Sequence, residues 1–161
     1  MTNETNTTVR KPILRGRSGA RELLLQVLYE ADLAGKDAAD LLDDRAAAVG
    51  LMPDDISFIS GLYASLHAIM DDIDRKIVLA APKRPLEQLA AIDRALLRLA
   101  TAELLSGDTP VAVAIDEAVG LAGRYGSDAS ARFVNGVLGT IQRAREDQPD
   151  SGSQSQAVTD G

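Results

Sequence analysis

Residues 86–105 read LEQLAAIDRALLRLATAELL, and the spacing of their apolar side chains decides the fold class. One side of the helix that this stretch would form carries Ile92, Leu96 and Leu99, and another side carries Leu97, Ala100 and Leu104. Apolar residues that recur every three or four positions indicate an α-helix. Because a helix that is apolar on two sides needs neighbours on both flanks, we expect this segment at the centre of a helical protein.

Amphipathic segments before and after this stretch predict further helices. They are expected at residues 18–34, 37–50, 53–81 and 111–125, and from residue 127 or 128 onward with Ser127 or Asp128 as the cap. Gly35 marks a helix end, Asp37 is a suitable N-cap, and Pro53 fits the first turn of a helix. Segment 53–81 is expected as one long helix that Pro82 and Pro85 end. Because no segment alternates with a period of two, the predicted fold is all-α, a compact bundle of about six to seven helices.

The composition excludes several classes of site. The chain has 161 residues, which fits one domain, and it contains no cysteine for a disulfide, a thiolate metal site or a thiol nucleophile. Its one histidine, His67, falls inside a predicted helix, where a structural role is commoner than catalysis. No apolar run is long enough to cross a membrane, and no phosphate-cradling loop motif is present. We therefore expect no catalytic residues, no metal site, no cofactor, and a cytoplasmic location.

The two ends of the chain differ from the middle. Residues 1–14 are polar and irregular, and residues 146–161 (EDQPDSGSQSQAVTDG) contain four acids and no cation. Neither end can bury enough apolar surface to offset the entropy of ordering it. We therefore expect a disordered N-terminal extension at 1–14, a helical domain at 15–145 and a disordered acidic tail at 146–161.

Positive charge is concentrated at one place in an acidic protein. Residues 10–21 hold five cations and no acid, although the whole chain carries a net charge of −7. The arginines Arg15, Arg17 and Arg21 approach the start of the first predicted helix, where the helix dipole also favours anions. Tyr29 lies two turns beyond Arg21 and can offer a ring to an unstacked base. Two interpretations remain open with equal weight: a polyanion contact, or a solvated basic segment with Tyr29 as packing.

The stretch FVNGVL at 133–138 also departs from what a helix alone would select. Asn135 and Gly136 together cost a helix roughly 1–1.5 kcal/mol relative to alanine. The favoured explanation is that Gly136 and Gly139 let another helix approach closely. The alternative is that Asn135, with Arg132 and Phe133, reads RNA through an amide, a cation and a ring.

Four stretches together resemble the NusB family of bacterial transcription antitermination factors. They are ARELLLQVLY at 20–29, IDRALLRLA at 92–100, VAIDEAVGLA at 113–122 and FVNGVLG at 133–139. The resemblance spans about residues 15–142 and implies an all-α fold of two small helical subdomains. It also implies binding to boxA, a single-stranded signal in ribosomal RNA leader transcripts, together with the ribosomal small-subunit protein that acts as NusE, within the antitermination complex on RNA polymerase.

The resemblance also implies site residues. The residues expected to contact RNA are Arg17, Arg21, Tyr29, Arg132, Phe133 and Asn135. The charge pattern adds Arg15 to this set. Glu103 is expected to contact the partner protein. Two other functions stay open. The chain resembles the helical domain that precedes the catalytic domain of certain ribosomal RNA cytosine methyltransferases, although the sequence after residue 145 is too short to form such a catalytic domain. It can also be a protein-only helical scaffold, with a possible homodimer that hides the RNA surface.

Overall fold

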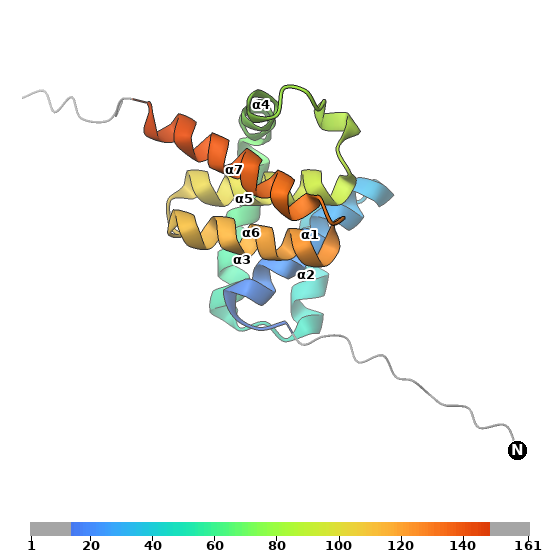
Figure 1. Ribbon diagram of the computed structural model, residues 1–161. Helices are drawn as coiled ribbons and strands as arrows, with labels where there is room; N and C mark the ends of the chain where they lie inside the picture. Colours follow the sequence, from blue (N-terminus) through green and yellow to red (C-terminus); the bar gives the residue numbers. More distant parts are fainter. Residues whose placement is uncertain (1–13, 149–161) are drawn as a thin grey trace, which may run out of the picture.

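The computed structural model describes residues 14–148, in which helices are joined by short connections (Figure 1). The elements are α1 (Gly16–Ala34), α2 (Ala38–Val49), α3 (Pro53–Ala68), α4 (Met70–Ala80), the short 3₁₀ turn η1 (Leu86–Gln88), α5 (Ala91–Ser106), α6 (Val111–Tyr125) and α7 (Ser130–Glu146). No strand occurs within these described residues. The predicted all-α class is confirmed.

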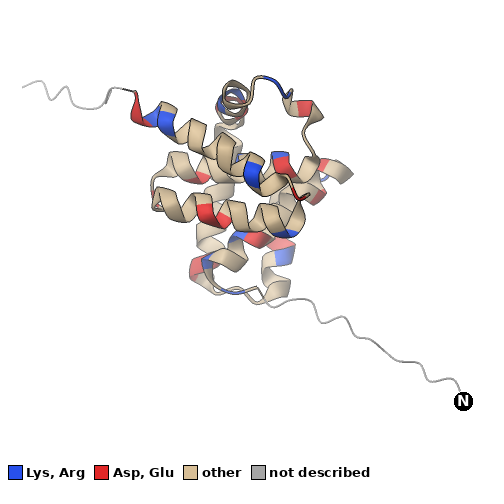
Figure 2. Cartoon of the chain, in the orientation of Figure 1, with Lys and Arg blue, Asp and Glu red and all other residues tan. Residues whose placement is uncertain are grey.

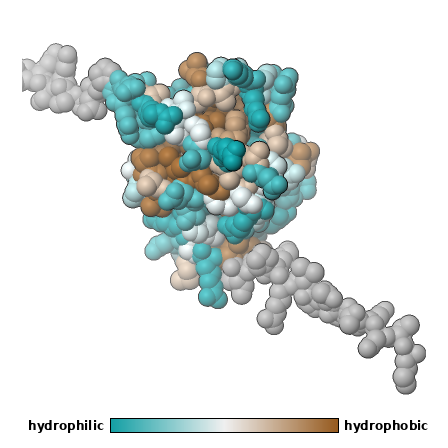
Figure 3. Space-filling view, viewed as in Figure 1, coloured by the Kyte–Doolittle hydropathy of each residue, from teal (hydrophilic) through white to brown (hydrophobic). Residues whose placement is uncertain are grey.

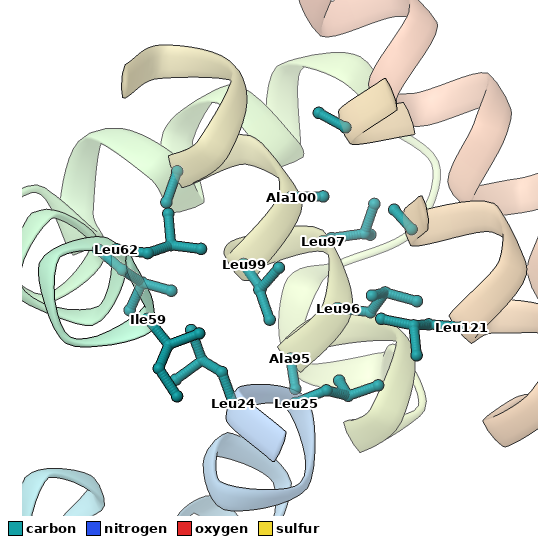
Figure 4. Close-up of a cluster of buried hydrophobic side chains, with 14 of the residues drawn as sticks. Leu24, Leu25, Ile59, Leu62, Ala95, Leu96, Leu97, Leu99, Ala100 and Leu121 are labelled. Carbon is teal, nitrogen blue, oxygen red and sulfur yellow. The ribbon is translucent and has the colours of Figure 1, made fainter. Parts of the chain in front are cut away.

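Helix α5 is the centre of the molecule, as its two apolar sides predict. It packs against α1 and α3 on one side and against α4, α6 and α7 on the other. Figure 4 shows side chains from α1, α3 and α6 converging on α5, including Leu24, Ile59 and Leu121. Leu96 and Leu97 are fully buried, and each buried leucine contributes roughly 1.5–3 kcal/mol to folding. The two groups of helices share one hydrophobic core around α5.

Several helix ends follow directly from the local sequence. The backbone at Gly35, with φ 63°, and at Gly107, with φ 73°, is left-handed and ends α1 and α5, a conformation that glycine adopts without a steric penalty. The carboxylate of Asp37 accepts a hydrogen bond of 2.8 Å from the Ala39 N–H and caps α2. Pro53 occupies the first turn of α3.

The expected single helix at 53–81 is wrong, because the chain breaks at Ile69 into α3 and α4. Ile69 leaves the helical region, with φ −122° and ψ 25°, although its N–H still bonds to the Ser65 carbonyl at 3.2 Å. The break lets α3 bury its apolar side against α1 and α5, while α4 buries Ile73 and Ile77 beside α5 and α7. A straight helix cannot face both groups. No proline or glycine marks this position, so the apolar spacing runs through it without interruption.

Other boundaries shift by a few residues. The segment expected as a helix at 86–105 divides into η1 and α5, and α7 begins at Ser130 and not at a cap provided by Ser127 or Asp128. The hydroxyl of Ser130 instead accepts a hydrogen bond of 2.9 Å from the Ser127 N–H, which closes the preceding turn. Leu14, expected in the N-terminal extension, is buried in the core, and α7 continues through Glu146.

The remainder of the two predicted disordered ends, residues 1–13 and 149–161, lies outside the described residues, as do Arg10 and Lys11 of the basic segment. Among the helices that the structure describes, none is both long and apolar enough to cross a bilayer.

Candidate nucleic-acid interface

The arginines divide into two groups according to whether a carboxylate holds them. Six form ion pairs with aspartate or glutamate: Arg21, Arg45, Arg75, Arg94, Arg98 and Arg124. Among the described residues, no carboxylate pairs with Arg15, Arg17, Arg84, Arg132, Arg143 or Arg145. In the second group, Arg143 and Arg145 donate to Thr140 and Gln142 on their own helix, whereas no side chain accepts a hydrogen bond from the guanidinium of Arg15, Arg17, Arg84 or Arg132 among the described residues. This distinction decides which of the predicted contacts the geometry allows.

Arg21 belongs to the first group and is enclosed in the protein. Its Nε lies 2.9 Å from Oε1 and 3.0 Å from Oε2 of Glu103, and its Nη2 donates to Oε1 at 2.5 Å. The side chains of Arg21 and Glu103 are only 4% and 1% exposed. Thr109 donates a further hydrogen bond of 2.8 Å to the same carboxylate. The pair joins α1 to α5.

This burial corrects two expectations. The expected RNA contact of Arg21 and the expected partner-protein contact of Glu103 both need an accessible side chain, and neither residue has one. A buried ion pair stays buried because each charge compensates the other, so separating the two for a ligand would be costly. Arg21 and Glu103 are therefore a structural pair that fixes α1 on α5.

Arg17 lies one turn before Arg21 and is exposed. Its guanidinium carbon lies 4.6 Å from the centroid of the Phe58 ring on α3, which holds the side chain at the surface by a cation–π contact. An open cavity of about 600 Å³ lies beside it, with Ser57, Ser106 and Asp108 among its lining residues. Arg15, at the N-cap of α1, is also exposed. The start of α1 thus presents two accessible guanidinium groups.

A polar seam between α1 and α6 leads from these arginines toward Tyr29. Ser18 donates a hydrogen bond of 2.6 Å to Glu117, and Gln26 donates one of 2.7 Å to the Tyr125 hydroxyl. The same hydroxyl donates to Glu22. Burial, and then the hydrogen bond to Glu22, raise the pKa of Tyr125 above its usual range. Tyr29 follows Gln26 by one turn and is 37% exposed, so its ring is partly accessible.

The start of α7 contributes the other predicted contacts. Arg132 and Asn135 are exposed, whereas Phe133 is half-buried and packs against the core. A side-chain carbon built on Gly136 would meet no atom within 4 Å, and one on Gly139 would meet only the Arg143 side chain, at 3.3 Å. The expectation that these glycines admit a neighbouring helix is therefore wrong. Asn135 and Gly136 lie on an open surface, and nothing inside the protein explains them.

Two residues at this surface were missed in the sequence. The guanidinium carbon of Arg84, in the connection between α4 and η1, lies 4.7 Å from the centroid of the Phe133 ring. Phe58 on α3 supports Arg17 in the same way. Each contact joins residues distant in the chain, so no local pattern could have revealed it. The sequence offered one indication only: Pro82 and Pro85 flank Lys83 and Arg84, which predicts a restricted basic turn.

The wider surface is mixed in character. Figure 2 shows acidic and basic residues interspersed, with basic residues near both ends of α7. Figure 3 shows that hydrophilic side chains cover much of this face, interrupted by a hydrophobic area near the beginning of α6. Within the described residues, no three His, Asp or Glu side chains are placed to hold a metal ion. His67 is exposed and stacks on Tyr63 at 5.9 Å between ring centroids.

A small helical domain that presents free arginines, partly exposed rings and an amide at the surface of α1 and α7 has the features of proteins that bind extended nucleic acid through phosphates and bases. The chain belongs to the NusB family, which it matches over residues 18–143.

Individual relatives and solved structures agree with this assignment. The transcription antitermination protein NusB of Dehalococcoides mccartyi strain CBDB1 is 43% identical over 132 residues, which are 81% of this chain and 92% of the relative. The structure of T. maritima NusB superimposes with a TM-score of 0.75 at 30% identity, over 80% of this chain and 91% of that one. A chain of the crystal structure of the antitermination factors NusB and NusE in complex with double-stranded RNA gives a TM-score of 0.73 at 27% identity, over 80% of this chain and 96% of that one.

Proposed function

We propose that this chain is a transcription antitermination factor that binds single-stranded boxA RNA of ribosomal RNA leader transcripts. It binds together with the ribosomal small-subunit protein that acts as NusE, within the antitermination complex on RNA polymerase. Its place of action is the cytoplasm, and it works by binding and not by catalysis.

The observation that carries the proposal is the distribution of free guanidinium groups. A chain with a net charge of −7 repels RNA in general, so binding has to rely on local cations. Arg15 and Arg17 at the start of α1 and Arg132 at the start of α7 are exposed and have no carboxylate partner among the described residues. The polar seam between α1 and α6 runs along α1 from Ser18 to Gln26, beside the first of these two groups.

Phosphate and base contacts have different candidates on this surface. Arg15, Arg17 and Arg132 supply forked donors for phosphate oxygens. Tyr29 supplies aromatic surface, and the amide of Asn135 can donate to and accept from a base edge. We assign direct RNA contact to these five residues, and Phe133, which packs against the core, supports this surface from beneath. Arg21 supports the site from inside, because its pairing with Glu103 positions α1.

Partner binding follows from the family. A solved structure contains the antitermination factors NusB and NusE in complex with double-stranded RNA, so all three components can be present in one assembly. A small basic surface gives modest RNA affinity, and a second protein that adds contact surface to the same strand increases it.

The direct test is fluorescence anisotropy of a labelled boxA oligonucleotide titrated with the full chain, with and without the NusE-type protein. A scrambled oligonucleotide of the same length and composition is the matched control. We expect tighter binding of boxA than of the scrambled strand, and a further gain when the partner is present. Equal binding of the two strands in both conditions would refute sequence-specific recognition.

A further inference from the structure

Both phenylalanines of this chain lie beneath an arginine side chain. Phe58 carries Arg17, and Phe133 carries Arg84 with 4.7 Å between the guanidinium carbon and the ring centroid. The Phe133 ring also packs against the core. With the core on one side and a guanidinium over it, Phe133 has little free ring surface for a base. The accessible planar surface at this place belongs to Arg84.

The connection that carries Arg84 is held in a fixed conformation. Pro82 and Pro85 flank the turn and restrict its backbone, and the Arg84 N–H donates a hydrogen bond of 3.1 Å to the Ala81 carbonyl. Arg94 anchors the next segment by donating to the carbonyls of Leu86 and Leu89, each at 3.3 Å. In Figure 1 this connection descends on the same side of the molecule as the beginning of α7. The guanidinium is therefore positioned before any ligand binds.

The charge around Arg84 also favours a polyanion. Arg84 and its neighbour Lys83 are exposed, and neither pairs with a carboxylate among the described residues. Arg132, beside Phe133 on α7, is a third free cation. By contrast, Arg94 is paired with Asp32 at 2.7 Å, and the exposed Arg75 on α4 is paired with Asp72 at 3.5 Å.

We infer that Arg84 stacks an RNA base on the outer face of its guanidinium, so that Phe133 acts as the support of this platform. Lys83 binds the adjacent phosphate. The α4–η1 connection is thereby part of the RNA interface. This inference rests on the proposed function, which supplies RNA as the ligand. A guanidinium plane stacks on bases of any kind, whereas the compact ammonium group of lysine has no such plane.

Arg84→Lys separates stacking from charge. The full chain and its variants are titrated with labelled boxA RNA and with a set of the same strands that each carry one abasic site. We expect Arg84→Lys to weaken binding of intact RNA by about three- to tenfold, the range of a lost stacking contact, with an unchanged salt dependence. At one position in the strand, the abasic site should weaken RNA binding by the wild type but leave RNA binding by Arg84→Lys unchanged.

Two further variants complete the design. Lys83→Ala should reduce the slope of log affinity against log salt by about 0.7, the effect of one lost phosphate contact on a single strand. Arg75→Ala, which removes the same charge from a neighbouring exposed site, should bind like the wild type. Thermal melting checks that each variant is folded.

The outcomes are distinct. If Arg84→Lys binds every strand as the wild type does, or if its loss is the same at all abasic positions, base stacking on Arg84 is refuted and the side chain only covers Phe133. A wild type that prefers no sequence refutes the proposed function, but the abasic comparison still tests stacking because it does not need sequence preference. A wild type that binds no RNA overturns both.

Discussion

Replacing Arg21 by methionine separates a structural role of its guanidinium from a role in RNA binding. Methionine keeps most of the side-chain length but removes the three hydrogen bonds to Glu103. Glu103, whose side chain is 1% exposed, would then retain only its hydrogen bond from Thr109. Breaking a buried pair by removing one partner costs about 3–5 kcal/mol, because the remaining charge is buried without compensation. We expect a loss of that size in the free energy of unfolding.

The double replacement Arg21→Met with Glu103→Met provides the control. It removes both charges, so most of the lost stability should return. A deficit of about 1 kcal/mol should remain, because the Thr109 hydroxyl loses its acceptor. Urea unfolding followed by helical circular dichroism measures all three proteins, and RNA binding is compared at a temperature at which each is folded.

The result that would refute this reasoning is specific. If Arg21→Met unfolds within about 1 kcal/mol of the wild type, the buried pair does not hold α1 on α5 as the structure indicates. If the folded variant also binds RNA with a flatter salt dependence, Arg21 contacts phosphate and the surface proposed above needs to include it.

Four other predictions follow from the geometry. Arg17→Ala should reduce the slope of log RNA affinity against log salt by about 0.7 without lowering the melting temperature, and an unchanged slope would remove the start of α1 from the interface. Gly19→Ala should destabilise the fold by about 1–3 kcal/mol, because the new carbon would lie 2.8 Å from the Leu14 carbonyl carbon. Gly136→Ala should stabilise it by about 0.5–1 kcal/mol, because nothing lies within 4 Å, and urea unfolding that shifts both glycine variants in the same direction would contradict this. The raised pKa of Tyr125 means that the folded chain holds the phenolic proton more tightly than the unfolded chain does. The stability advantage of the wild type over Tyr125→Phe should therefore decrease as the pH rises above about 10. A constant difference between the unfolding free energies of the two proteins would show that the pKa is not raised.

Most of the fold could be predicted from apolar spacing and helix-end residues. The central position of α5 followed from its two apolar sides. The end of α1 followed from Gly35, and the start of α2 followed from the capping Asp37. The break at Ile69 could not be predicted, because the apolar spacing continues through it and only the packing of α4 on α7 requires it. Local sequence carries no information about such a change of direction.

The site was harder to predict than the fold, for two different reasons. The sequence did indicate that Arg21 is buried, because Arg21 shares its helix side with Leu24, Leu25 and Leu28 at spacings of three, four and seven. The prediction of RNA contact followed its charge and not this spacing. The contact of Arg84 with Phe133 had none, because it joins a loop to a helix far along the chain. Spacing predicts which side of a helix faces inward, but not which loop lies over it.

The pairing of α1 with later helices has a consequence for synthesis on the ribosome. Glu103 follows Arg21 by 82 positions, and Tyr125 follows Glu22 by 103. At translation rates of about 5–20 residues per second, Arg21 waits roughly 4–16 seconds for its carboxylate to be made. During that time its charge has to stay hydrated, so α1 cannot dock on α5 until residue 103 has been made. A nascent chain that stalls before α5 therefore has basic residues but no assembled surface with which to engage a transcript.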